Sequence, residues 1–310
     1  MMTYEQFKEN TKKHFIGYMP DEYKGYHVEF KTVAKVNQVL DGFVIQAPGA
    51  TVSPQIYLND VYEVYLETES FPKAMHIMCE ILVDEITRTD DLDARSIIEN
   101  AEERIVFQLI NTEKNKELLK TVPHRNFLDL SIIFVVSVNV SEANSYGALR
   151  ISNRIAEALG WTEEQLFQMA WENTKSLFPF EIDTMRHILM KQLFEADVPE
   201  PVAEAMIYAP EGLDDEMWIL TNEQKFNGGI ILLYEEELHN LAEKLESDLY
   251  LLPSSRHEII AVSAKVTMPE RLAEMVQQVN EEFVDEKNFL SNSVYHYGRT
   301  SRIISLFMRM

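Results

Sequence analysis

The sequence lacks the features of disulfide-rich, membrane-spanning and secreted proteins. It has one cysteine, Cys79, in 310 residues, which excludes an internal disulfide framework. No window approaches the roughly 18 consecutive apolar residues that a membrane span requires. The N-terminal stretch MMTYEQFKENTKKHF has lysines but no apolar segment, so we expect no signal peptide. These absences together predict a cytoplasmic protein.

Basic residues are also scarce. The chain has 28 Lys and Arg against 51 Asp and Glu, a net charge of −23. A charge of this sign repels phosphate backbones and anionic membranes, so we expect neither direct nucleic-acid binding nor membrane binding. The acids are spread along the chain, which favours ordinary solubility over mimicry of nucleic acid. A protein partner with a basic surface fits this charge.

Common catalytic and cofactor-binding motifs are absent. The sequence contains no GxxxxGK[ST] or GxGxxG phosphate loop, no GxSxG nucleophile elbow, no HExxH zinc helix and no CxxC pair. We therefore predict no cofactor and no metal site. This set of absences favours a binding function over catalysis.

The apolar residues, 46% of the chain, are sufficient for a large core and follow both helical and strand periods. Helical spacing occurs at residues 4–18, 72–86, 235–246 and 269–283, and a helix start occurs at residues 161–166. Strand patterns occur at residues 26–32, 43–46, 52–58, 104–110, 127–138, 217–221, 229–234, 249–252, 259–262 and 294–297. Strands that come in runs predict an α+β fold with mixed or antiparallel sheets and packed amphipathic helices. We place two lobes at residues 1–120 and 121–310.

Some helix ends are marked by specific residues. Thr162 and Gln165 fit a capping box at the start of one helix, and Gly160 ends the helix before it. Asn59 or Asp60 is placed to cap the helix that follows the strand at 52–58. These patterns predict where three helices meet their loops.

Two Asx-Gly pairs and one long apolar run bear on the sheets. Asp41-Gly42 and Asn227-Gly228 predict hairpin turns. Residues 127–138 are apolar on both faces apart from Asp129 and the serines, which predicts a central strand. The tyrosines of QIYLNDVYEVYLE suit either a ligand groove or packing between strand and helix, and their spacing favours packing.

The stretch LLPSSRHEII, residues 251–260, holds the residue types of nucleophilic catalysis. Ser255, His257 and Glu258 match the roles of nucleophile, general base and orienting carboxylate. Successive side chains of a strand point to opposite faces, so Ser255 and His257 share a face while Glu258 points away. A triad is usually assembled from distant segments, which weighs against this interpretation.

A metal site is a second interpretation of the same stretch. His257 and Glu258 are adjacent, unlike the spacing of a zinc helix, and His124 and His296 would have to complete the ligand set. No recognisable ligand spacing supports it.

The third interpretation is structural. Ser254 and its neighbouring serine satisfy backbone groups in a turn, while Arg256 and the residues after it pair with charges at a sheet edge. Asp129 is the first candidate partner because its burial in an apolar strand would require compensation. His124 and Arg125, just upstream, are competing candidates. We favour this interpretation.

Several stretches together resemble a known family. They are QIYLNDVYEVY, HRNFLDLSIIFVVSV, LGWTEEQLFQMAWENT, MWILTN, GGIILLY, DLYLLPSSRHEIIAV, MVQQVNEEFV and LSNSVYHY. In this order they resemble an uncharacterised bacterial family catalogued as a domain of unknown function, number fifty-six eighty-eight, over nearly the whole chain. Residues 161–262 are also distantly similar to a second uncharacterised bacterial family.

The resemblance implies one architecture along the chain and a soluble bacterial protein, but no activity. The family's motif matches Pro253, Ser254, Ser255, His257 and Glu258, and this chain has an arginine at position 256 where the family often has an apolar residue.

We therefore predict a binding or regulatory protein-interaction module. One alternative is a hydrolase-type enzyme in which His257 is the general base of a pocket with Ser255, Glu258, Asp129 and His124. Another is an acidic mimic of nucleic acid.

Overall fold

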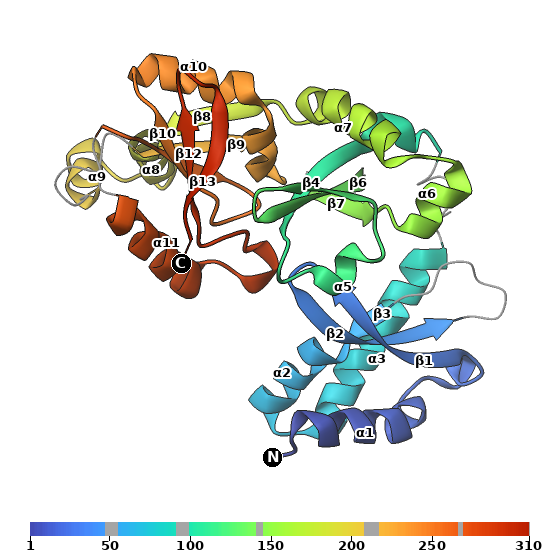
Figure 1. Cartoon of the computed structure of the whole chain (residues 1–310). Coiled ribbons are helices and arrows are strands. Elements are labelled where there is room, and N and C mark those ends of the chain that lie inside the picture. The colour runs from blue at the N-terminus through green and yellow to red at the C-terminus, as the bar shows by residue number, and fades with distance from the viewer. Residues whose placement is uncertain (47–54, 91–98, 141–144, 208–216, 266–268, 310) are drawn as a thin grey trace. The chain divides into compact units, whose positions relative to one another are not determined.

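The computed structural model describes residues 1–46, 55–90, 99–140, 145–207, 217–265 and 269–309 (Figure 1). The chain divides into two compact units, Met1–Ala101 and Glu102–Met310. This division lies upstream of the predicted lobe boundary at residue 120. The reason is β4 (Ile105–Asn111), which pairs along its whole length with β6 (Leu130–Val140) and so belongs with the second unit.

Within its described residues, 1–46, 55–90 and 99–101, the first unit has a three-stranded antiparallel sheet and three α-helices. Its elements are α1 (Tyr4–His14), the 3₁₀ helices η1 (Phe15–Gly17) and η2 (Asp21–Tyr23), β1 (His27–Lys35), β2 (Gln38–Gln46), β3 (Gln55–Tyr57), α2 (Leu58–Thr68) and α3 (Phe71–Asp90). Phe7, Phe43 and Met75 come from a different element each and are fully buried in one core. The apolar stripe predicted for residues 72–86 forms the buried face of α3.

The predicted turn at Asp41-Gly42 is wrong, because both residues lie within β2. The chain reverses direction earlier, at residues 36–37 between β1 and β2, where Asn37 takes a left-handed conformation with φ 61°. Gly42 leaves room for a side chain of the neighbouring strand, since a Cβ there would lie 2.1 Å from the side-chain nitrogen of Gln55 in β3.

The next helix, α2, begins one residue before the predicted cap. Tyr57 occupies the N-cap position without a side-chain bond, and neither Asn59 nor Asp60 caps the helix. The tyrosines here pack as predicted: Tyr65 is 4% exposed and Tyr62 contacts it in a stacked arrangement.

The second unit contains a four-stranded antiparallel sheet in which β6 is central, as the sequence predicts. β6 pairs with β4, with β5 (His124–Phe127) and with β7 (Ser145–Arg150). The helical elements of this part are η3 (Ala101–Arg104), α5 (Lys116–Leu119), α6 (Asn153–Leu159) and α7 (Glu163–Leu177). α7 packs on β4 through a bond from the amide of Phe107 to the Thr174 hydroxyl at 3.1 Å.

The start of α7 confirms the prediction. Thr162 is the N-cap, and its side chain and that of Gln165 form the reciprocal bonds of a capping box. Gly160 ends α6 in a left-handed conformation with φ 69°.

A six-stranded antiparallel sheet completes the second unit, in the order β13-β12-β10-β11-β9-β8. Its strands are β8 (Phe180–Thr184), β9 (Met217–Asn222), β10 (Leu249–Leu252), β11 (Ile259–Ser263), β12 (Val294–Gly298) and β13 (Ile303–Met308). The accompanying helices are α8 (Met185–Glu195), α9 (Glu200–Met206), η4 (Gly228–Leu233), α10 (Glu235–Leu245), α11 (Pro269–Phe283) and η5 (Glu286–Asn288). The fold class is α+β, as the sequence predicts.

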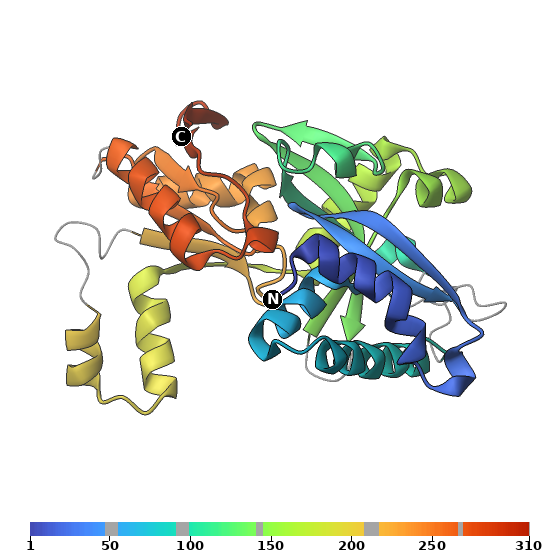
Figure 2. The same ribbon diagram turned by 90° about the horizontal axis from the view of Figure 1, so that it is seen from below.

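The helices of this sheet differ in burial. α11 packs Leu272, Ala273 and Val276 into a core with strand residues, whereas Phe283 at its end is 76% exposed. α8 has no buried residue, and Figure 2 shows α8 and α9 in yellow, extending away from the sheet. None of the helices in the described ranges has the length and apolar content needed to cross a membrane.

The predicted hairpin around Asn227-Gly228 is also wrong. Asn227 is left-handed, with φ 51°, but residues 228–233 then form the 3₁₀ helix η4 in place of a strand. The glycine is needed for close packing, because a Cβ on Gly228 would lie 2.4 Å from the carbonyl oxygen of His257. The edge strand β13 is not among the strands predicted from the sequence.

Candidate functional site

Residues 253–258, the PSSRHE segment, connect β10 to β11 and are bonded through their backbone. The amides of Ser291 and Leu290 donate to the carbonyls of Pro253 and Ser254 at 2.9 and 3.0 Å. Ser254 is 5% exposed. One side of the segment is therefore paired with the chain that follows η5.

The other side of the PSSRHE segment packs against the start of η4. The amide of Gly229 donates to the carbonyl of Arg256 at 3.0 Å, and the Thr221 hydroxyl donates to the carbonyl of His257 at 2.7 Å. A Cβ on Gly229 would lie 3.0 Å from the Arg256 carbonyl oxygen. Backbone from two directions thus holds the segment, and glycine is required where η4 begins.

No hydrogen bond joins the Ser255 hydroxyl to the His257 ring in the part of the chain that the structure describes. The Ser255 hydroxyl accepts a bond from the backbone amide of His257 at 3.1 Å. The imidazole Nδ1 lies 3.0 Å from the Lys225 carbonyl oxygen, and Nε2 accepts from Arg256 Nε at 3.2 Å. The carbonyl at Nδ1 and the Arg256 donor at Nε2 fit a neutral ring with its proton on Nδ1, and the Asn288 side-chain amide also lies 3.2 Å from Nε2. Glu258 is exposed, and no bond between it and His257 occurs in the described part of the chain.

Burial lowers the pKa of His257, and the adjacent Arg256 guanidinium lowers it further. Bonds to the Asn288 side chain and the Lys225 carbonyl act in the opposite direction. Burial also lowers the pKa of Arg256. The lowered pKa favours the neutral form of the ring at neutral pH.

Asp129 lies in the tight turn between β5 and β6, where Leu128 is left-handed with φ 55°. Its carboxylate accepts bonds from the hydroxyls of Ser291 at 2.6 Å, Ser293 at 2.9 Å and Tyr295. The structure gives Asp129 these partners in place of the charged residues of the PSSRHE segment. Burial, followed by the Asp129 charge, raises the pKa of Tyr295.

Arg125 and His124 also lie away from the PSSRHE segment, on β5. Arg125 binds both carboxylate oxygens of Glu163, at 2.8 and 3.0 Å, and Glu164 at 2.8 Å. Its guanidinium lies 3.9 Å from the ring centroid of Phe167. The bond to Glu163 is the main cause that raises the pKa of Arg125. His124 is exposed at the end of the strand.

The proposed metal ligands are not brought together. His296 lies on β12, with Nε2 at 3.2 Å from an Asp248 carboxylate oxygen. Within the described ranges, no group of three or more His, Cys, Asp and Glu side chains converges on a point that could hold a metal ion.

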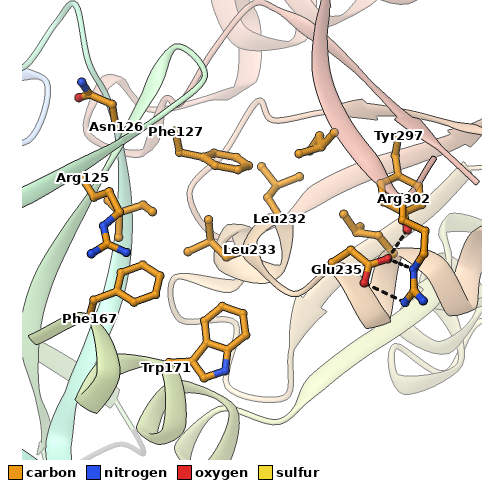
Figure 3. A pocket seen from close by; sticks show the side chains of 13 residues that line it. Arg125, Asn126, Phe127, Phe167, Trp171, Leu232, Leu233, Glu235, Tyr297 and Arg302 are labelled. Carbon is orange, nitrogen blue, oxygen red and sulfur yellow. Dashed lines mark hydrogen bonds and ion pairs between the residues drawn. The ribbon is translucent and has the colours of Figure 1, made fainter. Parts of the chain in front are cut away.

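A cleft of about 300 Å³ opens elsewhere in the second unit, between β5 and α7 on one side and η4, α10 and the β12–β13 hairpin on the other (Figure 3). The residues that line this aromatic cleft are Arg125, Asn126, Phe127, Ile132, Phe167, Trp171, Leu232, Leu233, Glu235, Leu238, Tyr297, Arg302 and Ile304. Its volume is at the lower end of the range for ligand sites. The lining is mostly apolar, with charged groups at two places.

One end of the aromatic cleft is closed by a bonded charge pair. Arg302 binds both oxygens of Glu235, with Nη2 to Oε2 at 2.8 Å, and the Tyr297 hydroxyl donates to Glu235 at 2.7 Å. The bond from Arg302 is the main cause that lowers the pKa of Glu235. Figure 3 shows this group opposite Phe167 and Trp171, with Leu232 and Leu233 between them.

Beside the cleft, the outer face of α7 forms a shallow groove of about 510 Å³. The residues of this α7 groove are Glu164, Phe167, Gln168, Trp171 and Glu172. The last four of these residues lie three, four, seven and eight positions after Glu164, which places all five on one face of the helix. The buried face of the helix is a different one, formed by Leu166, Ala170 and Thr174.

Trp171 belongs to both the cleft and the groove. It stacks on Tyr234 with centroids 4.6 Å apart and on Phe167 at 6.1 Å, and still remains 38% exposed. Tyr234 is 4% exposed, and its hydroxyl donates to the Trp171 carbonyl at 2.9 Å. The indole is therefore held in place while part of its surface faces solvent.

Arg125 is among the residues predicted from the sequence, whereas the aromatic residues beside it are not. A usable signal was present: Phe167 and Trp171 fall outside the stripe of Leu166, Ala170 and Thr174, and acidic residues flank them. Apolar residues outside the buried stripe of a helix are candidates for a binding face.

Comparison with known proteins gives one family. The model of a family described as Family of unknown function (DUF5688) matches residues 4–299. The matched range spans both units and contains every residue that lines the cleft except Arg302 and Ile304. No curated protein and no solved structure matches the chain.

Proposed function

We propose that this chain, which belongs to the Family of unknown function (DUF5688), is a protein-interaction module that binds a segment of a partner protein in the aromatic cleft. The observation that carries this proposal is Trp171, which is fixed by stacking on a buried tyrosine yet remains 38% exposed. Large, rigid aromatic side chains next to a hollow are the residues that contribute most binding energy in protein interfaces.

The composition of the cleft supports binding over catalysis. Among its lining residues there is no serine, cysteine, histidine, lysine or aspartate. Glu235 is the one carboxylate that lines it, and both of its oxygens are engaged by Arg302. A cleft with this lining can bury apolar groups of a ligand and orient the ligand, but it lacks a free nucleophile with its base.

The net charge of −23 supports a partner with a basic surface, since opposite charges speed encounter and suppress wrong partners. We place this interaction in the bacterial cytoplasm. The single cysteine, Cys79, is a buried free thiol, and burial raises its pKa to about 11.

A library of random 12-residue peptides, displayed and selected on the full chain, tests the proposal. Selected peptides should bind with dissociation constants on the order of micromolar. Leu233→Asp, which places a carboxylate among the cleft's apolar side chains, should weaken binding at least about tenfold, or about 1.4 kcal/mol. Titration calorimetry of each selected peptide measures this.

The matched control is Leu159→Asp, which changes a leucine of α6 that is 39% exposed and does not line the cleft. It should bind the peptides as the unchanged chain does, and circular dichroism should show both variants folded. Failure to enrich any peptide, or equal binding to Leu233→Asp and the unchanged chain, would contradict the proposal.

A further inference from the structure

We infer that the α7 groove binds the guanidinium group of an arginine side chain on the protein partner. The inference rests on the proposed function and names the chemistry that one part of the surface recognises. It places the arginine against Trp171, with Glu172 as the carboxylate acceptor, next to the Phe167 ring and the Glu164 carboxylate that Arg125 already contacts.

The chain contains its own example of this recognition. Arg125 lies with its guanidinium 3.9 Å from the Phe167 ring centroid and donates to Glu163 and Glu164 at 2.8 to 3.0 Å. An aromatic ring beneath a guanidinium and carboxylates at its edge satisfy both its face and its N–H groups. The α7 groove contains a second aromatic ring and a second carboxylate further along the helix, because Trp171 lies four residues after Phe167 and Glu172 lies eight residues after Glu164.

The α7 groove and the residues next to it carry a net negative charge. Glu163, Glu164 and Glu172 contribute three negative charges and Arg125 one positive charge, which leaves a local charge of −2. The next cation along α7, Lys175, pairs with Glu237 at 3.1 Å. In the part of the chain that the structure describes, Glu172 is exposed and forms no ion pair. A cationic side chain would therefore complete an unfinished charge arrangement.

The ring geometry favours arginine over lysine. Phe167 and Trp171 are inclined by 21°, and Trp171 and Tyr234 by 20°, so the rings form a nearly parallel stack. A planar guanidinium can lie along such a surface while its edge donates to the Gln168 amide oxygen and to carboxylates. An ammonium is a compact, strongly hydrated charge and cannot lie flat along an aromatic surface in this way.

The test uses the indole N–H signals of the three tryptophans in the ¹⁵N-labelled full chain, with N-acetyl-arginine amide as the probe. The Trp171 signal, assigned with Trp171→Phe, should shift and saturate with a dissociation constant on the order of millimolar. Trp161 bonds Glu102 and Trp218 is 8% exposed beneath Lys244, so their signals serve as internal controls and should stay fixed.

Two comparisons make the result specific. N-acetyl-citrulline amide has the shape of arginine without its charge, and it should give no saturable shift; N-acetyl-lysine amide should bind several-fold more weakly. Glu172→Gln should weaken the arginine probe about fivefold. The control Glu157→Gln changes an exposed glutamate of α6 and should leave the titration unchanged.

Equal shifts with the citrulline or lysine probe, or no effect of Glu172→Gln, would overturn the inference. The selected 12-residue peptides then separate the two proposals: replacement of arginine by citrulline should weaken them about tenfold. Peptides that depend on Leu233 but tolerate citrulline would leave the proposed function standing and the arginine site wrong. A set of peptides insensitive to Leu233→Asp would remove the proposed function itself.

Discussion

The PSSRHE segment and the outer face of α7 both have residues of the types that serve catalysis or binding, but the surroundings of these residues differ. In the PSSRHE segment, the Ser255 hydroxyl and both His257 ring nitrogens bond to groups within the same fold. On α7, Trp171 remains 38% exposed and Glu172 has no ion-pair partner among the described residues. Polar groups that the fold has already satisfied support the scaffold, whereas fixed but unsatisfied groups are available to a partner.

The two regions should respond differently to substitution. Changes in the PSSRHE segment should alter the free energy of unfolding and leave peptide binding intact in the folded fraction. Changes at Arg125 or along the α7 groove should alter binding and leave stability nearly unchanged. A substitution that produces the opposite result would remove the distinction between the two regions.

The largest expected effect is that of Gly228→Ala. The added Cβ would lie 2.4 Å from the His257 carbonyl oxygen and 2.4 Å from the Thr221 hydroxyl, so the backbone must separate. We expect the free energy of unfolding to fall by about 3 kcal/mol, measured by urea denaturation. Gly17→Ala is the control because its Cβ would meet nothing within 4 Å. An unchanged unfolding midpoint for Gly228→Ala would show that the segment is not tightly packed.

A smaller effect concerns pH. The pKa of His257 in the folded chain lies below the value near 6.5 of an unfolded chain. Below pH 6.5 the unfolded state therefore binds a proton that the folded ring does not. The stabilising contribution is present above pH 6.5 and is lost as the pH falls toward the folded pKa.

His257→Gln tests this directly, since a glutamine amide can replace both ring bonds but does not titrate. Urea unfolding midpoints between pH 7.5 and 5.5 should decrease less in this variant than in the unchanged chain. Identical pH slopes for the two proteins would contradict a buried neutral ring.

The smallest expected change in stability comes from Arg125→Gln, on the α7 side of the comparison. The side chains of Arg125 and Glu163 are 35% and 36% exposed, so their loss should cost less than about 1 kcal/mol. The local charge would change from −2 to −3, and the affinity for N-acetyl-arginine amide should rise about threefold. The gain in affinity is expected only if the local negative charge attracts the probe. Weaker binding of N-acetyl-arginine amide to Arg125→Gln would therefore contradict a role of this charge.

The sequence predicts those parts of the fold that depend on neighbouring residues. The Thr162 and Gln165 capping box and the left-handed Gly160 are set by contacts within a few residues, and both are confirmed. Asn227-Gly228 also has a strong local pattern, but the prediction is wrong because Gly228 must fit against His257, 29 residues later. The conformation at residues 227–228 therefore depends on a contact between residues that are distant in the sequence.

The cleft depends on distant contacts throughout. Arg125, Trp171, Leu233 and Tyr297 come from four separate elements, and no local spacing relates them. The PSSRHE segment attracts notice because its polar residues are contiguous, and contiguity is the reason why they face different neighbours. A catalytic or binding arrangement assembled from separate elements has no equivalent pattern in one sequence.

The bonds of Asp129 also set an order of folding events. Its three hydroxyl donors lie 162, 164 and 166 residues further along the chain. At synthesis rates of about 5–20 residues per second, they leave the ribosome roughly 8 to 33 s after the carboxylate does. During that interval the carboxylate in the β5–β6 turn lacks these donors, until residues 291–295 have been made. Premature termination before Tyr295 would therefore expose a defect far from the break, near the middle of the sequence.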